Sequence, residues 1–250
     1  MIKKIYYAAA ILLMSFSMIP AKNKIKIFLA GDSTMSIKEV KAYPETGWGM
    51  PFANFWDSTV TVVNIAKNGR STKSFIEEGL WKQIYDQAGE GDYVLIQFGH
   101  NDEVPTKKNY TTEEEFKNNL VRYVQETRSK KAIPVLITPV ARREFDADGK
   151  IKETHPYAQL VRDVAIAQKT LLIDLDKKSM ELLQEFGKEN SKLLFNQVKP
   201  DEHPNYPEGK EDNTHFNELG ARKMAEIVLA EIKSQKMELA DHIFKPTKKL

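Results

Sequence analysis

Five short apolar runs along the chain have the length and composition of buried β-strands. They are rich in Val, Ile and Leu, which is typical of parallel strands covered on both faces of a sheet. The runs occupy residues 24–30, 59–66, 92–99, 132–140 and 170–175. Amphipathic segments separate them, so the order predicts right-handed βαβ units and a three-layer α/β domain around a parallel sheet of about five strands.

Two of the amphipathic segments carry signals for the start of a helix. Thr112 and Glu115 have the spacing of a capping box, and Asn217 is a candidate N-cap before the last apolar stripe. The apolar positions that follow at helical spacing are Phe116, Leu120, Val121 and Val124 in the first segment, and Leu219, Met224, Ile227, Val228 and Ile232 in the second. We interpret both stripes as faces that pack on the core.

The first residues follow a different pattern. Lys3 and Lys4 precede a short apolar run, and Pro20 and Ala21 then lead into a polar stretch. This order is typical of a secretory signal peptide, and the run is too short to favour a membrane-spanning helix. We expect a signal peptide over residues 1–21 and a secreted or periplasmic bacterial protein with no stable membrane association after cleavage; the alternative is an uncleaved anchor.

The rest of the chain, residues 22–250, is expected to form one domain that acts as a monomer. A chain of 250 residues can bury one substantial core, and we find no repeat or long linker that would divide it. We expect the core to span 24–232 and a solvated tail to occupy 237–250.

Charge and cysteine content exclude several classes of function. Without Lys3 and Lys4 the count of Lys and Arg falls from 37 to 35, which equals the 35 acidic residues. A formally neutral chain argues against nucleic acid as a partner, because phosphate binding needs a basic surplus. The chain has no cysteine, which excludes disulfides and a thiolate nucleophile.

Polar residues with chemical potential directly follow the predicted strands. In doubly wound sheets the ligand binds outside the carboxyl ends of the strands. Ser33, in the stretch FLAGDSTMS, follows the first run, and the residues after the next three are Asn68 and Gly69, then Gly99–Asp102, then Thr138–Arg143. Ser33 therefore suits either a turn or a nucleophile held at the end of a strand.

His215 is the best candidate among the histidines for a base that activates Ser33. A serine hydroxyl becomes a good nucleophile when an imidazole takes its proton, and a carboxylate orients that imidazole. Asp212 precedes His215 by three residues, so one short loop would supply both groups. His203 also has acidic neighbours, but nothing in the sequence would hold it against Ser33.

An oxyanion hole needs hydrogen-bond donors aimed at the alkoxide of a tetrahedral intermediate. Gly69 permits a close approach of the backbone, the Asn101 amide is a neutral donor, and the Ser33 N–H is a third candidate. Gly69 and Asn101 each fit an ordinary turn as well. Their joint placement after consecutive strands favours the functional interpretation.

Four blocks of the sequence, in order, resemble those of the SGNH or GDSL hydrolase superfamily. They are GDST, the NGRSTKSF stretch with Gly69, GHND and DNTHF. The additional segments YPETGWG, LITPVARREF and DNTHFNELGA resemble the rhamnogalacturonan acetylesterase branch, from about Lys24 to Ile232. The resemblance implies a flavodoxin-like sheet and a serine esterase with no metal or other cofactor.

The resemblance also implies roles for individual residues. Ser33 would be the nucleophile, His215 the general base and Asp212 the acid that orients it, while Gly69 and Asn101 would join the Ser33 N–H in the oxyanion hole. The chain has no G-x-S-x-G nucleophile elbow, so it does not match the lipase-type α/β-hydrolases.

The implied substrate is an acetylated polysaccharide or oligosaccharide, with pectic rhamnogalacturonan first. Arg142 or Arg143 would pair with a galacturonate carboxylate, unless they belong to a solvated loop. Trp48 would stack on a sugar ring, unless it is a core residue, and His203 is a further candidate for the wall of the cleft. The alternatives are an SGNH esterase for acetylated xylan, lipid or thioester acyl groups, and a non-catalytic carbohydrate-binding protein of the same fold.

Overall fold

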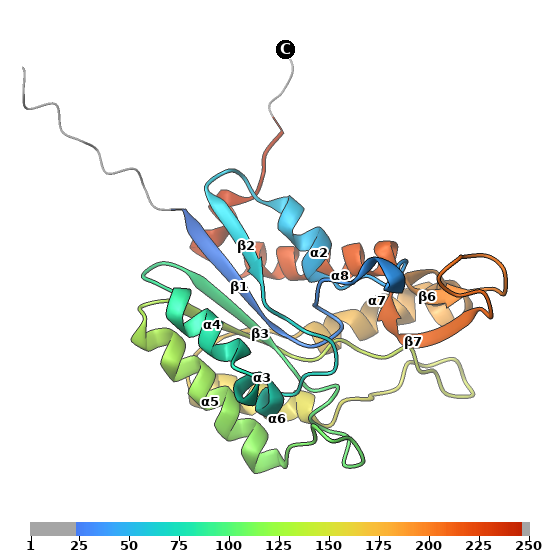
Figure 1. The fold of residues 1–250 in the computed structure, drawn as a ribbon, viewed down its shortest axis with the longest axis horizontal. Helices are drawn as coiled ribbons and strands as arrows, with labels where there is room; N and C mark the ends of the chain where they lie inside the picture. The colour runs from blue at the N-terminus through green and yellow to red at the C-terminus, as the bar shows by residue number, and fades with distance from the viewer. Residues whose placement is uncertain (1–23, 247–250) are drawn as a thin grey trace, which may run out of the picture.

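The computed structural model describes residues 24–246, and their central feature is a five-stranded parallel sheet with strand order β2-β1-β3-β4-β5 (Figure 1). The strands are β1 (Ile25–Gly31), β2 (Val60–Asn64), β3 (Tyr93–Gln97), β4 (Ile133–Ile137) and β5 (Leu171–Ile173). Each overlaps one predicted apolar run, so the predicted α/β sheet is confirmed. The predicted signal peptide lies outside the described residues.

Helices cover both faces of the sheet, and alternate residues of β1 show why. Ile27 and Leu29 pack into one apolar layer, whereas Phe28 and Ala30 pack into the other. The helices on the Phe28 side are α3 (Thr72–Glu77), α4 (Leu80–Gln87), α5 (Glu113–Ser129) and α6 (Tyr157–Ala167). Those on the Ile27 side are α2 (Gly49–Phe52), α7 (Leu175–Asn190) and α8 (Glu218–Ser234). Both faces of the strands are thus buried, which explains their unbroken apolar sequence.

The two predicted helix starts are present. Thr112 and Glu115 form a capping box at the start of α5. The Asn217 side chain accepts a hydrogen bond from the Gly220 N–H at the start of α8. The predicted apolar stripes face the core, except that Leu219 is 47% exposed.

A short antiparallel hairpin lies to the side of the main sheet and was not predicted. It consists of β6 (Phe195–Val198) and β7 (Lys210–Phe216), paired from Phe195 opposite Phe216 to Val198 opposite Lys210 (Figure 1). The β7 sequence KEDNTHF has mostly polar residues with weak strand propensity, so its conformation depends on pairing with β6. The expected loop around Asp212 and His215 is therefore part of a strand.

The expectation of a solvated tail from residue 237 is wrong for its first part. Met237, which precedes the 3₁₀-helix η4 (Glu238–His242), and Leu239 within it are buried in the core. The Phe244 N–H then donates to the Phe55 carbonyl in η2 (Ala53–Phe55).

The remaining 3₁₀-helices are η1 (Val40–Ala42) and η3 (Ser191–Leu194). None of the helices within residues 24–246 is both long and apolar enough to cross a lipid bilayer.

Candidate active site

Ser33 lies in a tight turn directly after the central strand β1. The Asp32 carboxylate holds this turn, because its Oδ1 accepts hydrogen bonds from the Thr34 N–H (2.9 Å) and the Thr34 hydroxyl (2.8 Å). The N–H groups of Met35 and Ser36 both donate to the Asp32 carbonyl. The turn presents the Ser33 side chain at the carboxyl end of the sheet, where it is 8% exposed.

His215 and Asp212 meet Ser33 in the arrangement of a catalytic triad. Nε2 of His215 lies 2.9 Å from Oγ of Ser33, and Nδ1 of His215 lies 2.9 Å from Oδ2 of Asp212. The other oxygen of Asp212 accepts hydrogen bonds from the backbone N–H groups of Thr214 (2.8 Å) and His215 (2.9 Å). The hairpin strand β7 thus carries base and acid to the serine from the far end of the sequence.

The charge state of Asp212 fixes the tautomer of the imidazole. Burial alone would raise the pKa of Asp212, but the hydrogen bond and charge of His215, with the two backbone N–H groups, outweigh burial and hold that pKa well below its usual range. A carboxylate can only accept hydrogen bonds, so Nδ1 of His215 carries the proton and donates a hydrogen bond to Asp212. Nε2 is then free to accept the hydroxyl proton of Ser33.

The predicted oxyanion donors gather beside Ser33. Asn101 is held on both sides, since its Nδ2 donates to the Arg70 carbonyl (3.0 Å) and its Oδ1 accepts from Lys107 Nζ (3.0 Å). An amide nitrogen has two hydrogens, so one donor of Asn101 remains for a ligand.

Gly69 contributes through its backbone. Its φ of +76° lies in the left-handed region that glycine adopts without strain. Neither Gly69 nor Ser33 lies in a helix or strand. Within residues 24–246, the N–H of neither residue donates to a backbone carbonyl. Both groups are therefore available to an incoming oxygen.

The triad and the oxyanion donors open into one cleft of about 410 Å³. Its lining consists of Ser33, Glu45, Asn68, Gly69, His100, Asn101, Lys107, Arg142, Asp212, Thr214 and His215. Every lining residue is polar or glycine. Glu45 and Lys107 were not predicted as site residues, because neither the YPETGWG segment around Glu45 nor the loop around Lys107 indicates which side chains reach the cleft.

His100 forms a buried wall of the cleft. Its ring packs edge-on against His155 at 4.4 Å between centroids. Burial lowers the pKa of His100 well below its ordinary value, and the neighbouring His155 and Arg142 act in the same direction, so the ring is neutral near pH 7. Nδ1 of His155 in turn lies 2.7 Å from a carboxylate oxygen of Glu103.

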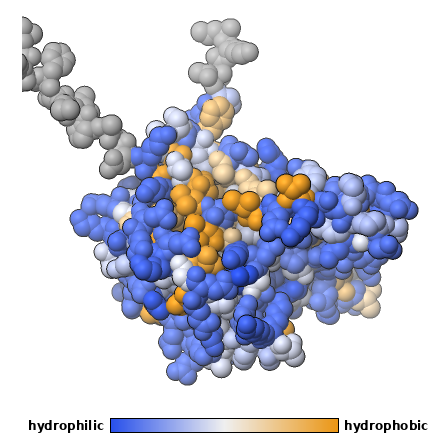
Figure 2. All heavy atoms as spheres, viewed as in Figure 1, coloured by the Kyte–Doolittle hydropathy of each residue, from blue (hydrophilic) through white to orange (hydrophobic). Residues whose placement is uncertain are grey.

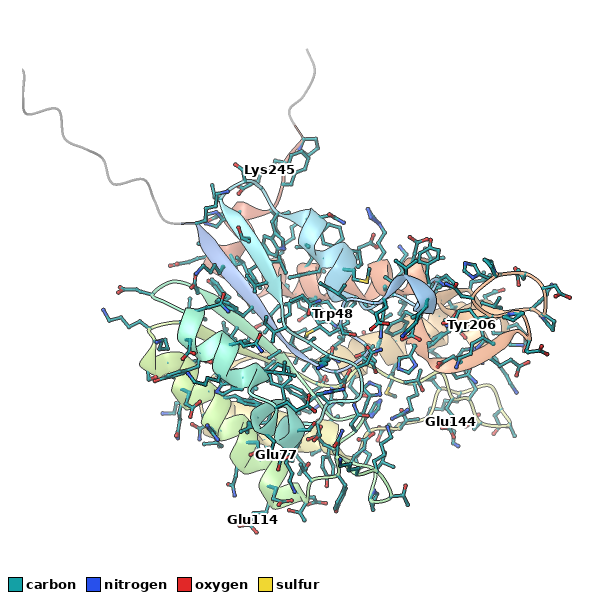
Figure 3. All side chains as sticks on the ribbon, viewed as in Figure 1. Trp48, Glu77, Glu114, Glu144, Tyr206 and Lys245 are labelled. Carbon is teal, nitrogen blue, oxygen red and sulfur yellow. The ribbon has the colours of Figure 1, made fainter. Side chains whose placement is uncertain are left out.

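Trp48 does not reach the cleft, so its prediction as a sugar-stacking residue is wrong and the alternative, a core residue, is confirmed. Its side chain is fully buried in the interior (Figure 3), and its Nε1 donates to Oε1 of Gln97 at 2.7 Å. Gln97 continues the chain of hydrogen bonds by donating to the Thr34 hydroxyl at 2.7 Å. Trp48 therefore supports the turn below Ser33 from inside the core.

The two candidate arginines point to different sides of the hairpin, as neighbours in an extended segment do. Arg142 lines the cleft and donates to the Thr214 hydroxyl at 3.1 Å. Arg143 instead lines a separate cavity of about 860 Å³ that contains no triad residue. Its guanidinium is bound by Asn213 and Ser191. Only Arg142 is placed to meet a substrate at Ser33.

His203 is not among the residues that line the cleft, so the prediction that it forms a cleft wall is wrong. Its ring packs against Tyr43 at 5.8 Å between centroids, and its Nδ1 accepts from the Asn205 N–H at 3.2 Å. These contacts hold the loop after β6 next to η1.

One group of side chains near the triad has the composition of a metal site. Glu45, Asp212 and His215 each offer a ligand atom, and these atoms lie within 4.8 Å of one another. However, Asp212 and His215 already use those atoms in the triad, and Glu45 accepts from Lys38 at 2.7 Å. A cation would have to break both pairs, so the donor set fits the triad better than a metal.

Comparison with known proteins agrees with this geometry. Residues 29–223 match the GDSL-like lipase/acylhydrolase family. Rhamnogalacturonan acetylesterase RhgT of Bacillus subtilis is 43% identical over 224 residues, which are 89% of this chain and 95% of that protein. The probable rhamnogalacturonan acetylesterase YesY of the same organism is 34% identical, over 88% of this chain and 97% of its own.

A solved structure extends the comparison to the fold. The crystal structure of YxiM from Bacillus subtilis has a TM-score of 0.75 at 27% identity, over 88% of this chain. This chain spans 58% of the length of that structure. The resemblance found in the sequence is confirmed: the chain belongs to the GDSL-like lipase/acylhydrolase family and is a hydrolase of carboxylic esters.

Proposed function

We propose that this protein is a secreted carbohydrate acetylesterase that removes O-acetyl groups from pectic rhamnogalacturonan through an acyl-serine intermediate. The cleft chemistry supports the acetyl ester, and the two named relatives support the polysaccharide. The pattern of residues 1–21 supports secretion.

In the proposed cycle His215 takes the proton of Ser33 as the hydroxyl attacks the acetyl carbonyl. The carbonyl oxygen becomes an alkoxide and accepts hydrogen bonds from the N–H groups of Ser33 and Gly69 and from the Asn101 amide. His215 then returns the proton to the sugar oxygen, and the sugar leaves. Water, activated by the same imidazole, releases acetate from Ser33.

The polar lining of the cleft is the observation that carries the acetyl assignment. A long acyl chain would need apolar walls, and none of the lining residues is apolar. A small acetyl group on a hydroxyl-rich sugar, in contrast, leaves no large apolar surface to cover. The lobe that carries the β6–β7 hairpin is also predominantly hydrophilic in the view of Figure 2.

Two cations at the cleft support an acidic sugar next to the acetylated one. Arg142 has 26% of its side chain exposed, and Lys107 lies on the same cleft. A guanidinium pairs with a carboxylate through two parallel hydrogen bonds between opposite charges, whereas the hydroxyls of a neutral sugar accept hydrogen bonds but carry no charge. Rhamnogalacturonan supplies such a carboxylate in its galacturonate units, whereas a xylan that carries only acetyl groups does not.

Acetate release from acetylated rhamnogalacturonan and from acetylated xylan tests this proposal, with Ser33→Ala as the inactive control. We expect release from the pectic polymer, loss in the variant, and a preference that falls when Arg142 is changed to Met. Equal release from xylan would overturn the pectic assignment but leave the esterase intact. Secretion is tested separately by recovering the protein from the medium or the periplasm and determining its N-terminal residue.

A further inference from the structure

Lys38 is a buried cation beside the nucleophile, and the cycle described above gives it no role. Its side chain is only 2% exposed, although lysine is rarely buried without partners. The ammonium has three acceptors: the Ser33 carbonyl at 2.5 Å, Oδ1 of Asn68 at 2.8 Å and a carboxylate oxygen of Glu45 at 2.7 Å. An ammonium has three hydrogens, so this set uses all of them.

The first two acceptors belong to the two segments that supply backbone donors to the oxyanion. The Ser33 carbonyl is part of the same residue as the Ser33 N–H, and Asn68 immediately precedes Gly69. The Ser36 hydroxyl lies within hydrogen-bond distance of both acceptors, at 3.3 Å from the Ser33 carbonyl and 2.6 Å from Oδ1 of Asn68. The turn after β1 and the turn after β2 are thus connected through Lys38.

Glu45 makes it possible for the charge to stay in this position. Burial lowers the pKa of Lys38, and the charge and hydrogen bond of Glu45 oppose that shift. Other acids lie near as well, since Asp32 and Asp212 act in the same direction as Glu45. Nearby acids therefore compensate the charge of the buried ammonium.

We propose that Lys38 is a positioning residue that sets the spacing of the oxyanion hole by connecting the backbone of Ser33 to the Asn68–Gly69 turn. This inference rests on the acyl-serine mechanism proposed above. Backbone donors cannot adjust through side-chain rotation, so their separation depends on the groups that hold the two turns. A donor that is displaced loses its value mainly in the transition state, where the oxygen carries charge.

Chemical restoration of the ammonium tests the proposal directly. The chain has no cysteine, so Lys38→Cys introduces its only thiol. Alkylation of the unfolded variant with 2-bromoethylamine, followed by refolding, replaces lysine with an analogue that carries the ammonium at nearly the same position. Alkylation with iodoacetamide gives a neutral side chain of comparable length.

With a chromogenic acetate ester, we expect Lys38→Cys to lower kcat about 10- to 100-fold with KM changed less than about threefold. Aminoethylation should return most of kcat, and carbamidomethylation should not. Lys41→Cys is the matched control, because Lys41 lies on η1 with 84% of its side chain exposed; it should keep wild-type kcat before and after alkylation. Equal kcat in all forms of Lys38→Cys, or equal restoration by both reagents, would overturn the proposal.

Asn68→Ala approaches the same connection from its other end and serves if Lys38→Cys does not refold. It should lower kcat with little change in KM, and Lys38→Met combined with Asn68→Ala should cost about as much as the larger single change. Fully additive losses would contradict a shared connection. The Ser33→Ala control distinguishes failure of the acyl-serine mechanism from failure of the role proposed for Lys38. Residual activity of Ser33→Ala would refute the mechanism. An inactive Ser33→Ala together with wild-type kcat in the Lys38 variants would refute the role of Lys38 alone.

Discussion

Nε2 of His215 lies 2.9 Å from Oγ of Ser33, although the two residues are 182 positions apart in the sequence. The serine follows the central strand β1, and the histidine lies near the end of β7, in the hairpin beside the sheet. Asp212 is on the same strand and faces the same imidazole. Base and acid are therefore placed by one short element, while the nucleophile is placed by the sheet.

Asp212→Asn should lower kcat by roughly 10⁴-fold while the protein keeps its fold. An amide can donate to Nδ1 of His215, which moves the proton to Nε2 and leaves no acceptor for Ser33. Steady-state kinetics on a chromogenic acetate, with circular dichroism of the same samples, measures this effect. A loss below tenfold would mean that the carboxylate does not fix the tautomer.

Asn101→Ala should lower kcat by about 10²–10³-fold, because one donor to the alkoxide is removed. KM should change little, since the ground-state carbonyl carries less charge. Asn118→Ala, on the exposed face of α5, is the control and should have the wild-type kcat. An unchanged kcat for the Asn101 variant would remove that side chain from the oxyanion hole.

Gly69→Ala should leave most of the activity, because the proposed donor is the backbone N–H. The position has φ +76° and open space where a Cβ would lie, so the cost is backbone strain of about 1–2 kcal/mol without a clash. Gly79 has φ +72° and similar open space outside the cleft. Urea titration should show that Gly79→Ala lowers the free energy of unfolding by a comparable amount. A severe loss of kcat confined to Gly69→Ala would contradict this prediction and show that the cleft does not tolerate a methyl group at residue 69.

Trp48→Phe should destabilise the protein without weakening polysaccharide binding. The change removes the donor to Gln97 and leaves a buried acceptor without its partner, which costs about 1–3 kcal/mol. Thermal unfolding and KM on the polysaccharide measure the two effects separately. An increase in KM at unchanged stability would instead support sugar stacking by Trp48.

Asp102→Asn should make stability less dependent on pH. Burial raises the pKa of Asp102 to about 7, against the hydrogen bonds from Thr72 and Thr111 that lower it. Between about pH 4 and pH 7 the unfolded chain has released this proton and the folded chain retains it, so stability falls as pH rises. Over that range the wild type should lose up to roughly 4 kcal/mol relative to the variant.

Denaturant titrations of both proteins at several pH values test this prediction. The asparagine keeps the carbonyl oxygen that accepts from Thr72 (2.8 Å from its N–H, 2.7 Å from its hydroxyl), so the variant should fold normally. A stability difference that is constant between pH 4 and pH 7 would show that Asp102 is ionised throughout in the folded protein.

Some of the site was visible in the sequence because its residues follow strands. The apolar runs predict the sheet, and the carboxyl ends of parallel strands meet at one edge, which brings Ser33, Gly69 and Asn101 together. Local signals at Thr112 and Asn217 also predict their helices, since capping depends on groups within one turn. The order of the blocks was enough to indicate the family.

The other parts of the fold and the site depend on contacts between segments that are far apart in the sequence, and a local sequence pattern does not reveal such contacts. β7 has a polar sequence and becomes a strand only by pairing with β6, while Trp48 is buried by packing that the sequence leaves open. Arg142 and Arg143 are neighbours of the same type, and only the path of the backbone separates the cleft residue from the other. The sequence by itself determined the strands, the helix caps and the chemical groups of the site; the tertiary structure alone decided which side chains face the cleft, because burial and hydrogen-bond partners are set by residues far away along the chain.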